Sequence, residues 1–236
     1  MRDAPRLLWP LTERAQTVAR NRGGNPALQG TYTNKPPPGF RGPAFGSTAP
    51  DFNGSTQRVQ RAADAALSPD PGGDFSVEVW CQNDAATPGT AEMIVTKDAP
   101  TNREYWLQYN PARGFAFAIG NTASGIYLEG NEGGTATDAR LWHHIVGTYV
   151  GATPFATLYV DGLAVGTDNT TSGSREFPSL SPFYVGARGN DTLFWNGRIS
   201  CAAYYGYALT AERVRAHTRA MQLPELSPPR ALLTSR

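Results

Sequence analysis

Cysteine and lysine are nearly absent from this sequence of 236 residues, which contains only two of each. Two cysteines, Cys81 and Cys201, are too few for a disulfide framework or for a metal site built from thiolates. Each falls on the apolar face of a predicted strand, which favours a small buried side chain over a reactive thiol. A single bridge between them stays open, because it would form only if the two strands are neighbours.

Charge is also scarce, since charged residues make up 17% of the chain and 21 basic residues nearly balance 20 acidic ones. The arginines are scattered along the sequence, so no net field would gather nucleic acid or an anionic membrane as a partner. No apolar run is long enough for a membrane span, and the first ten residues lack the pattern of a signal peptide. We therefore expect a protein made in a cytoplasm and not secreted by a signal peptide.

Glycine (25 residues) and proline (19) are abundant, which suits short strands joined by turns. Residues 75–81 show this most clearly, because Phe75, Val77 and Val79 alternate with polar or aromatic neighbours, the period of a β-strand. Similar segments, each bounded by turn-forming residues, predict further strands at 93–97, 105–109, 115–119, 126–129, 141–150, 156–161, 183–187 and 198–205. Many spaced strands of this kind indicate an all-β sandwich or barrel.

Three local signals refine this prediction. Asp161-Gly162 between two apolar runs predicts a tight hairpin with a type I′ turn. Thr210 is a good N-cap for a helix over 211–220, the one helix that the sequence predicts, with Val214, His217 and Met221 on one face. The Pro-rich residues that follow, 222–236, cannot continue this helix and are expected to form an extended arm.

The order of the motifs resembles the laminin G-like, concanavalin A-like lectin/glucanase jelly-roll family, which is common in bacterial and bacteriophage surface proteins. The resemblance implies an all-β sandwich of two antiparallel sheets over residues 7–221, with one short helix near the C-terminus, an extension at 1–6 and the arm at 222–236. The segments that carry it are 8–13 with 30–32, 51–55, 75–80, 142–149 with 158–162, and 194–199 with 204–212.

Some members of this family bind calcium on their loops, but two positions that are often aspartate in the family are Asn53 and Ser200 here. Ca²⁺ needs several oxygen ligands, usually including carboxylates, so these two changes argue against a bound ion. The oxygens of four aspartates could still serve, and whether a metal binds stays open at this point. These residues are Asp51, Asp138, Asp161 and Asp191.

No catalytic constellation is visible, so we expect a protein that is not an enzyme. His143 and His144 are adjacent on a predicted strand and must point to opposite faces, which prevents them from acting on one substrate together. Glycoside hydrolysis needs two carboxylates that face one cleft. Glu78, Glu104 and Glu129 are instead single acids, expected at exposed strand positions.

Aromatic residues form 11% of the chain, and sugars are bound by stacking on such rings. A lectin-like site is predicted where Trp106, Tyr109 or Trp195 would lie beside the polar loop residues Asn190 and Asp191. For each single ring, a place in the core is the competing interpretation, because large rings mostly fill sandwich interiors.

Two functional hypotheses follow. The first is a non-enzymatic structural protein of a bacteriophage virion, either a capsid decoration protein or a tail or fibre accessory subunit. It would bind other virion proteins through the arm at 222–236, with self-association left open. The alternative is a carbohydrate-binding lectin module that recognises cell-surface glycans. The sequence does not identify the glycan, the oligomeric state, or the location in capsid or tail.

Overall fold

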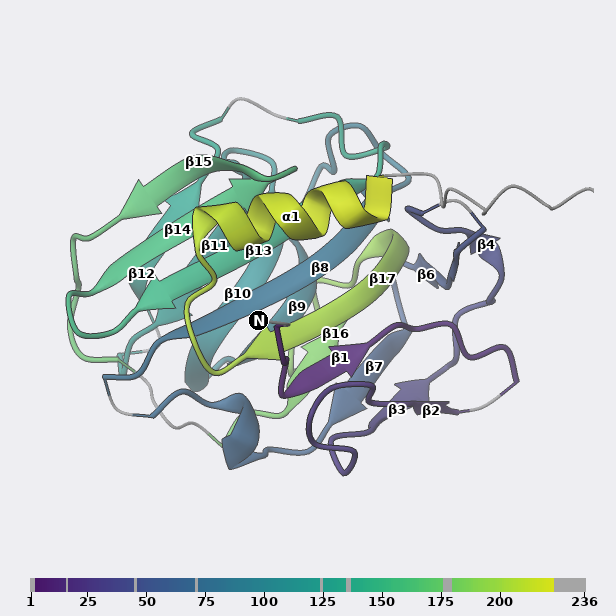
Figure 1. Cartoon of the computed structure of the whole chain (residues 1–236), viewed down its shortest axis with the longest axis horizontal. Coiled ribbons are helices and arrows are strands. Elements are labelled where there is room, and N and C mark those ends of the chain that lie inside the picture. Colours follow the sequence, from purple (N-terminus) through teal and green to yellow (C-terminus); the bar gives the residue numbers. More distant parts are fainter. Residues whose placement is uncertain are drawn as a thin grey trace, which may run out of the picture.

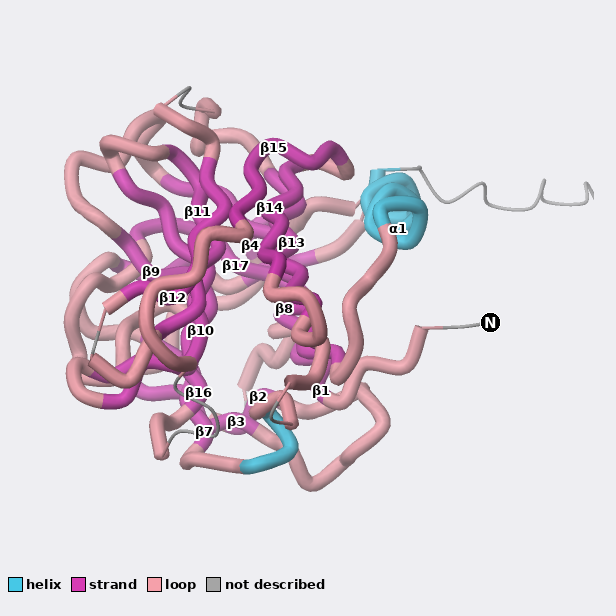
Figure 2. The backbone as a smooth tube through the Cα atoms, turned by 90° about the vertical axis from the view of Figure 1, so that its left-hand side faces the viewer, coloured by secondary structure: helices cyan, strands magenta, loops and turns pink. Residues whose placement is uncertain are grey.

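The computed structural model of the chain describes residues 3–15, 17–44, 46–70, 72–123, 125–134, 137–175 and 180–222. Two large antiparallel sheets face each other, and one α-helix lies on the outer side of one sheet (Figures 1 and 2). The predicted fold class, an all-β jelly-roll sandwich with a short helix near the C-terminus, is confirmed. No helix in the described part of the chain has the length and apolar composition needed to cross a bilayer.

The first sheet is seven-stranded and carries α1 (Ala211–Gln222) across its outer face, over β8 and β13 (Figure 1). Its strands, in spatial order, are β1 (Leu7–Trp9), β17 (Asn196–Tyr205), β8 (Phe75–Asn83), β13 (His143–Val150), β14 (Phe155–Val160) and β15 (Leu163–Asp168), with β6 (Asp51–Asn53) also paired to β17. Of the arm predicted at 222–236, residues 223–236 lie outside the described residues.

The second sheet is eight-stranded and ends at the short edge strand β2. Its strands, in spatial order, are β12 (Ile126–Asn131), β11 (Gly114–Gly120), β10 (Asn102–Asn110), β9 (Glu92–Ala99), β16 (Phe183–Val185), β7 (Arg58–Arg61), β3 (Gly30–Thr33) and β2 (Val18–Ala19). A separate ribbon pairs β4 (Phe40–Arg41) with β5 (Thr48–Ala49), and a 3₁₀ turn spans Ala65–Leu67. The edge position of β2 leaves the segment beside it accessible.

Aromatic rings fill the space between the sheets, because the strands place alternate side chains inward. Phe75 of β8 lies at the centre of this cluster, with its ring centroid 5.0 Å from that of Tyr105 and 5.5 Å from that of Tyr149. Phe117 and Tyr204 complete the contacts at 5.9 and 6.1 Å. All five rings are fully buried, so the core is built from both sheets at once.

The local predictions hold where the structure describes them. Asp161 and Gly162 have positive φ angles of 50° and 83°, as a type I′ turn between β14 and β15 requires. The Thr210 hydroxyl accepts the N–H of Arg213 at 3.3 Å and so caps α1. Cys81 and Cys201 are both free, although their strands β8 and β17 are neighbours.

Cys201 departs from the expected strand geometry. Its φ angle is +53°, and the register between β8 and β17 shifts between Ser200 and Ala203, so the chain bulges there. The thiol consequently contributes to a hollow of about 270 Å³ beside α1, away from the core in which Cys81 is buried. The two sulfurs therefore do not face each other across the strand pair.

The three acids that were expected at exposed positions are not exposed, and that expectation was wrong. Glu104 is fully buried and its carboxylate lies 2.5 Å from Nζ of Lys97, which is equally buried. The Glu129 side chain is 7% exposed and pairs with Arg113. Glu78 is covered by α1. Alternation along a strand gives the face of a residue, but not what covers that face.

Candidate functional site

The segment between β1 and β3 is anchored to the sandwich by Trp9. The indole N–H of this buried residue donates to the carbonyl of Leu28 at 2.8 Å, and its ring meets Phe183 edge-on at 5.4 Å. Gly30 makes room for it, since a Cβ atom there would lie 2.7 Å from the indole ring. The described residues of this segment, 12–15 and 17–29, are thus tied at both ends to the sandwich.

Two polar side chains brace the same segment from within. The Glu13 carboxylate accepts the backbone N–H of Arg20 at 2.9 Å and the phenol O–H of Tyr32 at 2.9 Å. Burial, together with this nearby carboxylate, raises the pKa of Tyr32, so the phenol keeps its proton. Asn21 accepts from the N–H groups of Leu8 and Gly23 and donates to two carbonyls. The segment therefore holds a defined shape.

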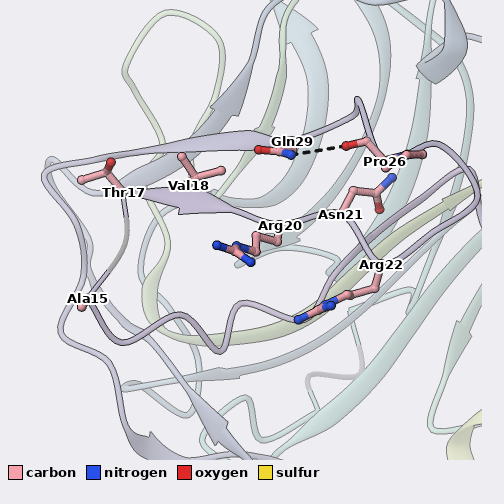
Figure 3. A pocket seen from close by; sticks show the side chains of 8 residues that line it. All are labelled: Ala15, Thr17, Val18, Arg20, Asn21, Arg22, Pro26 and Gln29. Carbon is pink, nitrogen blue, oxygen red and sulfur yellow. Dashed lines mark hydrogen bonds between the residues drawn. The ribbon is translucent and has the colours of Figure 1, made fainter.

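A groove of about 750 Å³ opens beside β2 within this braced segment (Figure 3). We call it the arginine groove, because Arg20 and Arg22 extend into the same space from the chain that leaves β2 (Figure 3). A second hollow of about 260 Å³ shares both arginines and adds Arg14. The remaining lining residues of the groove are Ala15, Thr17, Val18, Asn21, Pro26 and Gln29.

The arginine groove was not predicted from the sequence, in which the arginines were interpreted as scattered. Arg14, Arg20 and Arg22 are all exposed and lie within nine consecutive positions. Arg20 and Arg22 are also two residues apart on extended chain, which directs both side chains to one side. A local count of basic residues over 14–22 would have found this signal.

The aromatic residues that were predicted to bind a sugar are buried. Tyr109 and Trp195 lie in the core between the sheets, and Trp106 lies on the outer face of the eight-stranded sheet. There Ile126 and Leu193 pack against the cluster that contains Trp106, and the Arg103 guanidinium lies 4.0 Å from the centre of its ring. None of the three rings has a face toward solvent, so we correct this part of the predicted site.

Asn190 and Asp191, the polar half of the predicted site, are exposed on the loop between β16 and β17. The amide oxygen of Asn190 accepts the hydroxyl of Thr192 at 2.6 Å, and Asp191 pairs with Arg58 at 3.2 Å. Their contact with a ligand stays a prediction. The loop also carries Leu193, which packs against the cluster that contains Trp106.

The four aspartates considered for calcium do not gather at one place. Each has its own cationic or imidazole partner, which holds it away from a shared ion. The pairs are Asp51 with Arg198, Asp138 with Arg140, Asp161 with His143, and Asp191 with Arg58. Among the described residues, no three His, Cys, Asp or Glu side chains are placed to hold a metal ion. The arrangement does not fit a calcium site at these residues.

A cluster of titratable groups lies beneath α1. Glu78 of β8 accepts from His144 at 2.7 Å, from Tyr205 at 2.6 Å and from His217 of α1 at 3.1 Å. His217 also contacts Asp3 at 2.8 Å. This set, the helix cluster, joins α1 to the outer face of the seven-stranded sheet.

The charges of the helix cluster stabilise one another. Burial opposes ionisation of Glu78, but the hydrogen bonds of His144 and His217 outweigh it and hold the pKa of Glu78 well below its usual range. The hydrogen bond to Glu78 raises the pKa of His217 to about 8, so this imidazole is a cation at neutral pH. Burial and the Glu78 charge both raise the pKa of Tyr205.

The carboxylate, imidazole and hydroxyl of Glu78, His144 and Thr218 lie in a row that superficially resembles a nucleophilic triad. The Thr218 hydroxyl, 2.7 Å from His144, is itself directed at the carbonyl of Val214 at 3.0 Å. Its proton is thus given to the helix backbone and not to the imidazole, and Thr218 and His144 are buried. A nucleophile needs a base for its proton and access to substrate. This row fastens α1 to the sheet instead.

His143 lies on the opposite face of β13 from His144, as predicted, and bonds Asp161 at 2.7 Å.

The comparisons with known structures agree on the fold. The binding domain of paraclostridial mosquitocidal protein 1 is similar with a TM-score of 0.70 and 13% identity, over 92% of this chain and 52% of that one. The botulinum neurotoxin serotype G binding domain is similar with 0.64 and 12%, over 92% and 51%. Domain 4 of AbnA, a GH43 extracellular arabinanase from Geobacillus stearothermophilus, solved with arabinotriose, is similar with 0.57 and 18%, over 90% and 97%.

The chain spans about half the length of the two toxin domains, and identities this low show likeness of fold alone. A search of curated proteins finds no match. The family model described as the concanavalin A-like lectin/glucanases superfamily matches residues 53–215, more than half of the sequence. Because that match covers most strands of both sheets, and because the two layers have the architecture it implies, the chain belongs to the concanavalin A-like lectin/glucanase superfamily.

Proposed function

We propose that this chain is a non-catalytic carbohydrate-binding domain and that the arginine groove is its ligand site. The observation that carries the proposal is the groove itself, about 750 Å³ in volume and lined by hydrogen-bonding side chains. Binding sites for small molecules fall in this range of volume and position a few polar groups around the ligand. Guanidinium N–H groups are donors that match the hydroxyl and ring oxygens of a sugar.

The comparisons support this proposal. Two of the similar structures are named as binding domains, and the arabinanase domain was solved in complex with arabinotriose. The arabinanase domain is also covered over 97% of its length, so the likeness extends to a whole accessory domain of an enzyme.

The arrangement of carboxylates favours binding over hydrolysis. Glycosidases place two carboxyl groups about 5 to 10 Å apart across a substrate cleft. Among the described residues, the one acid that lines the arginine groove or its adjoining hollow is Glu13, which is engaged by Tyr32 and the backbone of Arg20. Glu78 is engaged by three side chains beneath α1.

A glycan array probed with the purified protein, with and without Ca²⁺, tests the proposal. We expect binding that persists in a chelator, because the candidate calcium ligands are each held by another partner. Silence across the array under both conditions would contradict the proposal. Hydrolysis of any oligosaccharide, lost on Glu78→Gln or Glu129→Gln, would replace it with an enzymatic function.

A narrower role on a bacteriophage virion, as capsid decoration or a tail or fibre accessory subunit, is a second proposal. It is supported by the family resemblance and by the Pro-rich residues 222–236, of which 223–236 lie outside the described residues. A sandwich attached to a particle could also adhere to host glycans, so the two roles are compatible. Particles that lack the protein should take up the full chain but not a chain that ends at Met221. Equal uptake of both would remove the role of the arm.

A further inference from the structure

We infer that the ligand of the arginine groove is an acidic oligosaccharide whose carboxylate is held by Arg14, Arg20 and Arg22. This inference rests on the proposed carbohydrate-binding function and specifies its ligand class. The three guanidiniums line two hollows that share Ala15, Arg20 and Arg22, so they surround one continuous space. Guanidinium is always charged and presents paired N–H donors that match a carboxylate.

The groove and its adjoining hollow bring together arginines that have no acidic partner, as Arg41, Arg215 and Arg219 also have none elsewhere in the described residues. Among the described residues, the guanidiniums of Arg14 and Arg22 have no hydrogen bond or ion pair. Most arginines elsewhere are paired with a carboxylate. The pairs are Arg58–Asp191, Arg61–Asp64, Arg103–Asp98, Arg113–Glu129, Arg140–Asp138, Arg188–Asp98, Arg198–Asp51 and Arg213–Asp3. An anion supplied by a ligand would complete the pairing that the chain itself does not provide.

Hydrogen bonds within the chain fix the shape of the arginine groove without a ligand. Asn21, between Arg20 and Arg22, makes four hydrogen bonds that fix the backbone from which both side chains leave. Glu13, the one acid beside the groove, is bonded to Tyr32 and to the Arg20 backbone. The carboxylate of Glu13 therefore stabilises the backbone that forms the wall of the groove. Because three arginines and one glutamate line the groove and its adjoining hollow, this space is electropositive. A pre-formed site loses less conformational entropy on binding.

Neutral parts of the sugar have partners along the same wall. Thr17 and Gln29 are exposed at the groove, where a hydroxyl and an amide can bond sugar hydroxyls (Figure 3). Val18 and Pro26 add apolar surface. This mixture suits a saccharide that carries one acidic group better than a small inorganic anion, which would use the arginines alone.

Two pairs of probes that differ only in the carboxylate test the inference by titration calorimetry. They are hexagalacturonate against its methyl ester, and sialyllactose against its methyl ester, with inorganic phosphate as a third arm. We expect at least one acid to bind about tenfold or more tightly than its neutral partner, the effect of one good charge-assisted contact. We expect Arg14→Gln with Arg22→Gln to abolish that difference.

Arg215→Gln with Arg219→Gln is the matched control, because it removes the same charge from exposed positions on α1. It should leave the preference intact. Neutral sugars that bind as tightly as acids, an acid preference that survives Arg14→Gln with Arg22→Gln, or phosphate that binds as tightly as the acids would each overturn the inference while the carbohydrate-binding function stands. Failure of every glycan on the array would remove the function itself.

Discussion

The helix cluster and the arginine groove both concentrate charge, but the charges of the first are buried and paired while those of the second are exposed and include two guanidiniums without partners. Beneath α1, Glu78 is surrounded by His144, His217 and Tyr205. In the groove, Arg14 and Arg22 face solvent. Paired buried charges hold elements together, and unpaired exposed charges are available to a ligand. The difference separates residues that stabilise the fold from those that we propose to bind a ligand.

The largest expected effect comes from breaking the helix cluster. Glu78→Gln should lower the free energy of unfolding by about 3 kcal/mol, because it removes the buried carboxylate that pairs with both His144 and His217 and leaves His217 with Asp3 alone. Urea denaturation measures this loss. The exposed Glu212→Gln on α1 is the control, expected to cost about 0.5 kcal/mol. Equal losses in the two variants would mean that burial and pairing add nothing at Glu78.

A rise in pH should weaken the same cluster. The pKa of His217 is about 8 in the folded protein and about 6.5 when unfolded, so its contribution is complete below pH 6.5 and is lost as the pH rises through 8. The loss should reach about 2 kcal/mol. His143 acts in the same direction, because its bond to Asp161 raises its pKa despite burial.

Thermal unfolding from pH 6 to 9 checks this expectation, with His217→Gln as the comparison. The variant should show a flatter profile, with the slope that His143 contributes and, near pH 9, that of the free thiols Cys81 and Cys201, whose pKa burial raises. An identical profile in the variant would assign the pH dependence to other groups.

Removing the N-cap of α1 should lower the free energy of unfolding by a smaller amount. Thr210→Ala removes the hydroxyl that caps the helix at the N–H of Arg213 and should cost about 1 kcal/mol. Thr210→Ser, which keeps the hydroxyl, should restore most of the stability. Denaturation midpoints of the three proteins decide this, and a harmless Thr210→Ala would show that the sheet contacts alone hold α1.

The smallest expected change in stability is in the groove. Arg14→Gln with Arg22→Gln should alter the free energy of unfolding by no more than about 0.5 kcal/mol, because neither guanidinium makes a bond within the described residues. The same variant should lose the preference for acidic probes. A large loss of stability would instead give these arginines a structural role and erase the contrast between the two regions.

The fold was predictable because its strands, turns and helix are each indicated by short stretches of neighbouring residues. Alternation over residues 75–81, the Asp161-Gly162 turn and the cap at Thr210 each depend on a few neighbouring residues, and the structure confirms all three. What covers each sheet depends on residues far away in sequence. Glu78 was expected to be exposed for that reason, since His217, which covers it, lies 139 positions later.

The candidate site was harder to predict than the fold. Trp106 and Trp195 were reasonable candidates by type, but a sequence does not say whether an aromatic ring has a free face, and both rings are buried. Three arginines within residues 14–22 indicate the arginine groove. This local excess of basic residues is hidden when basic and acidic residues are counted over the whole chain, where their numbers are nearly equal. The lining of the groove by Gln29 depends on how β2 and β3 pair, which spacing alone does not give.

The sequence of the braced segment, residues 12–29, can change separately from that of the sandwich. Residues 12–29 lie outside the family match at 53–215, and Trp9, which does not line the groove, anchors this stretch to the sandwich through the carbonyl of Leu28. Ligand choice can therefore be exchanged without rebuilding the scaffold. A library that varies only Arg14, Thr17, Arg20, Arg22 and Gln29 should yield folded proteins with new preferences, so that this short stretch behaves as an interchangeable recognition insert.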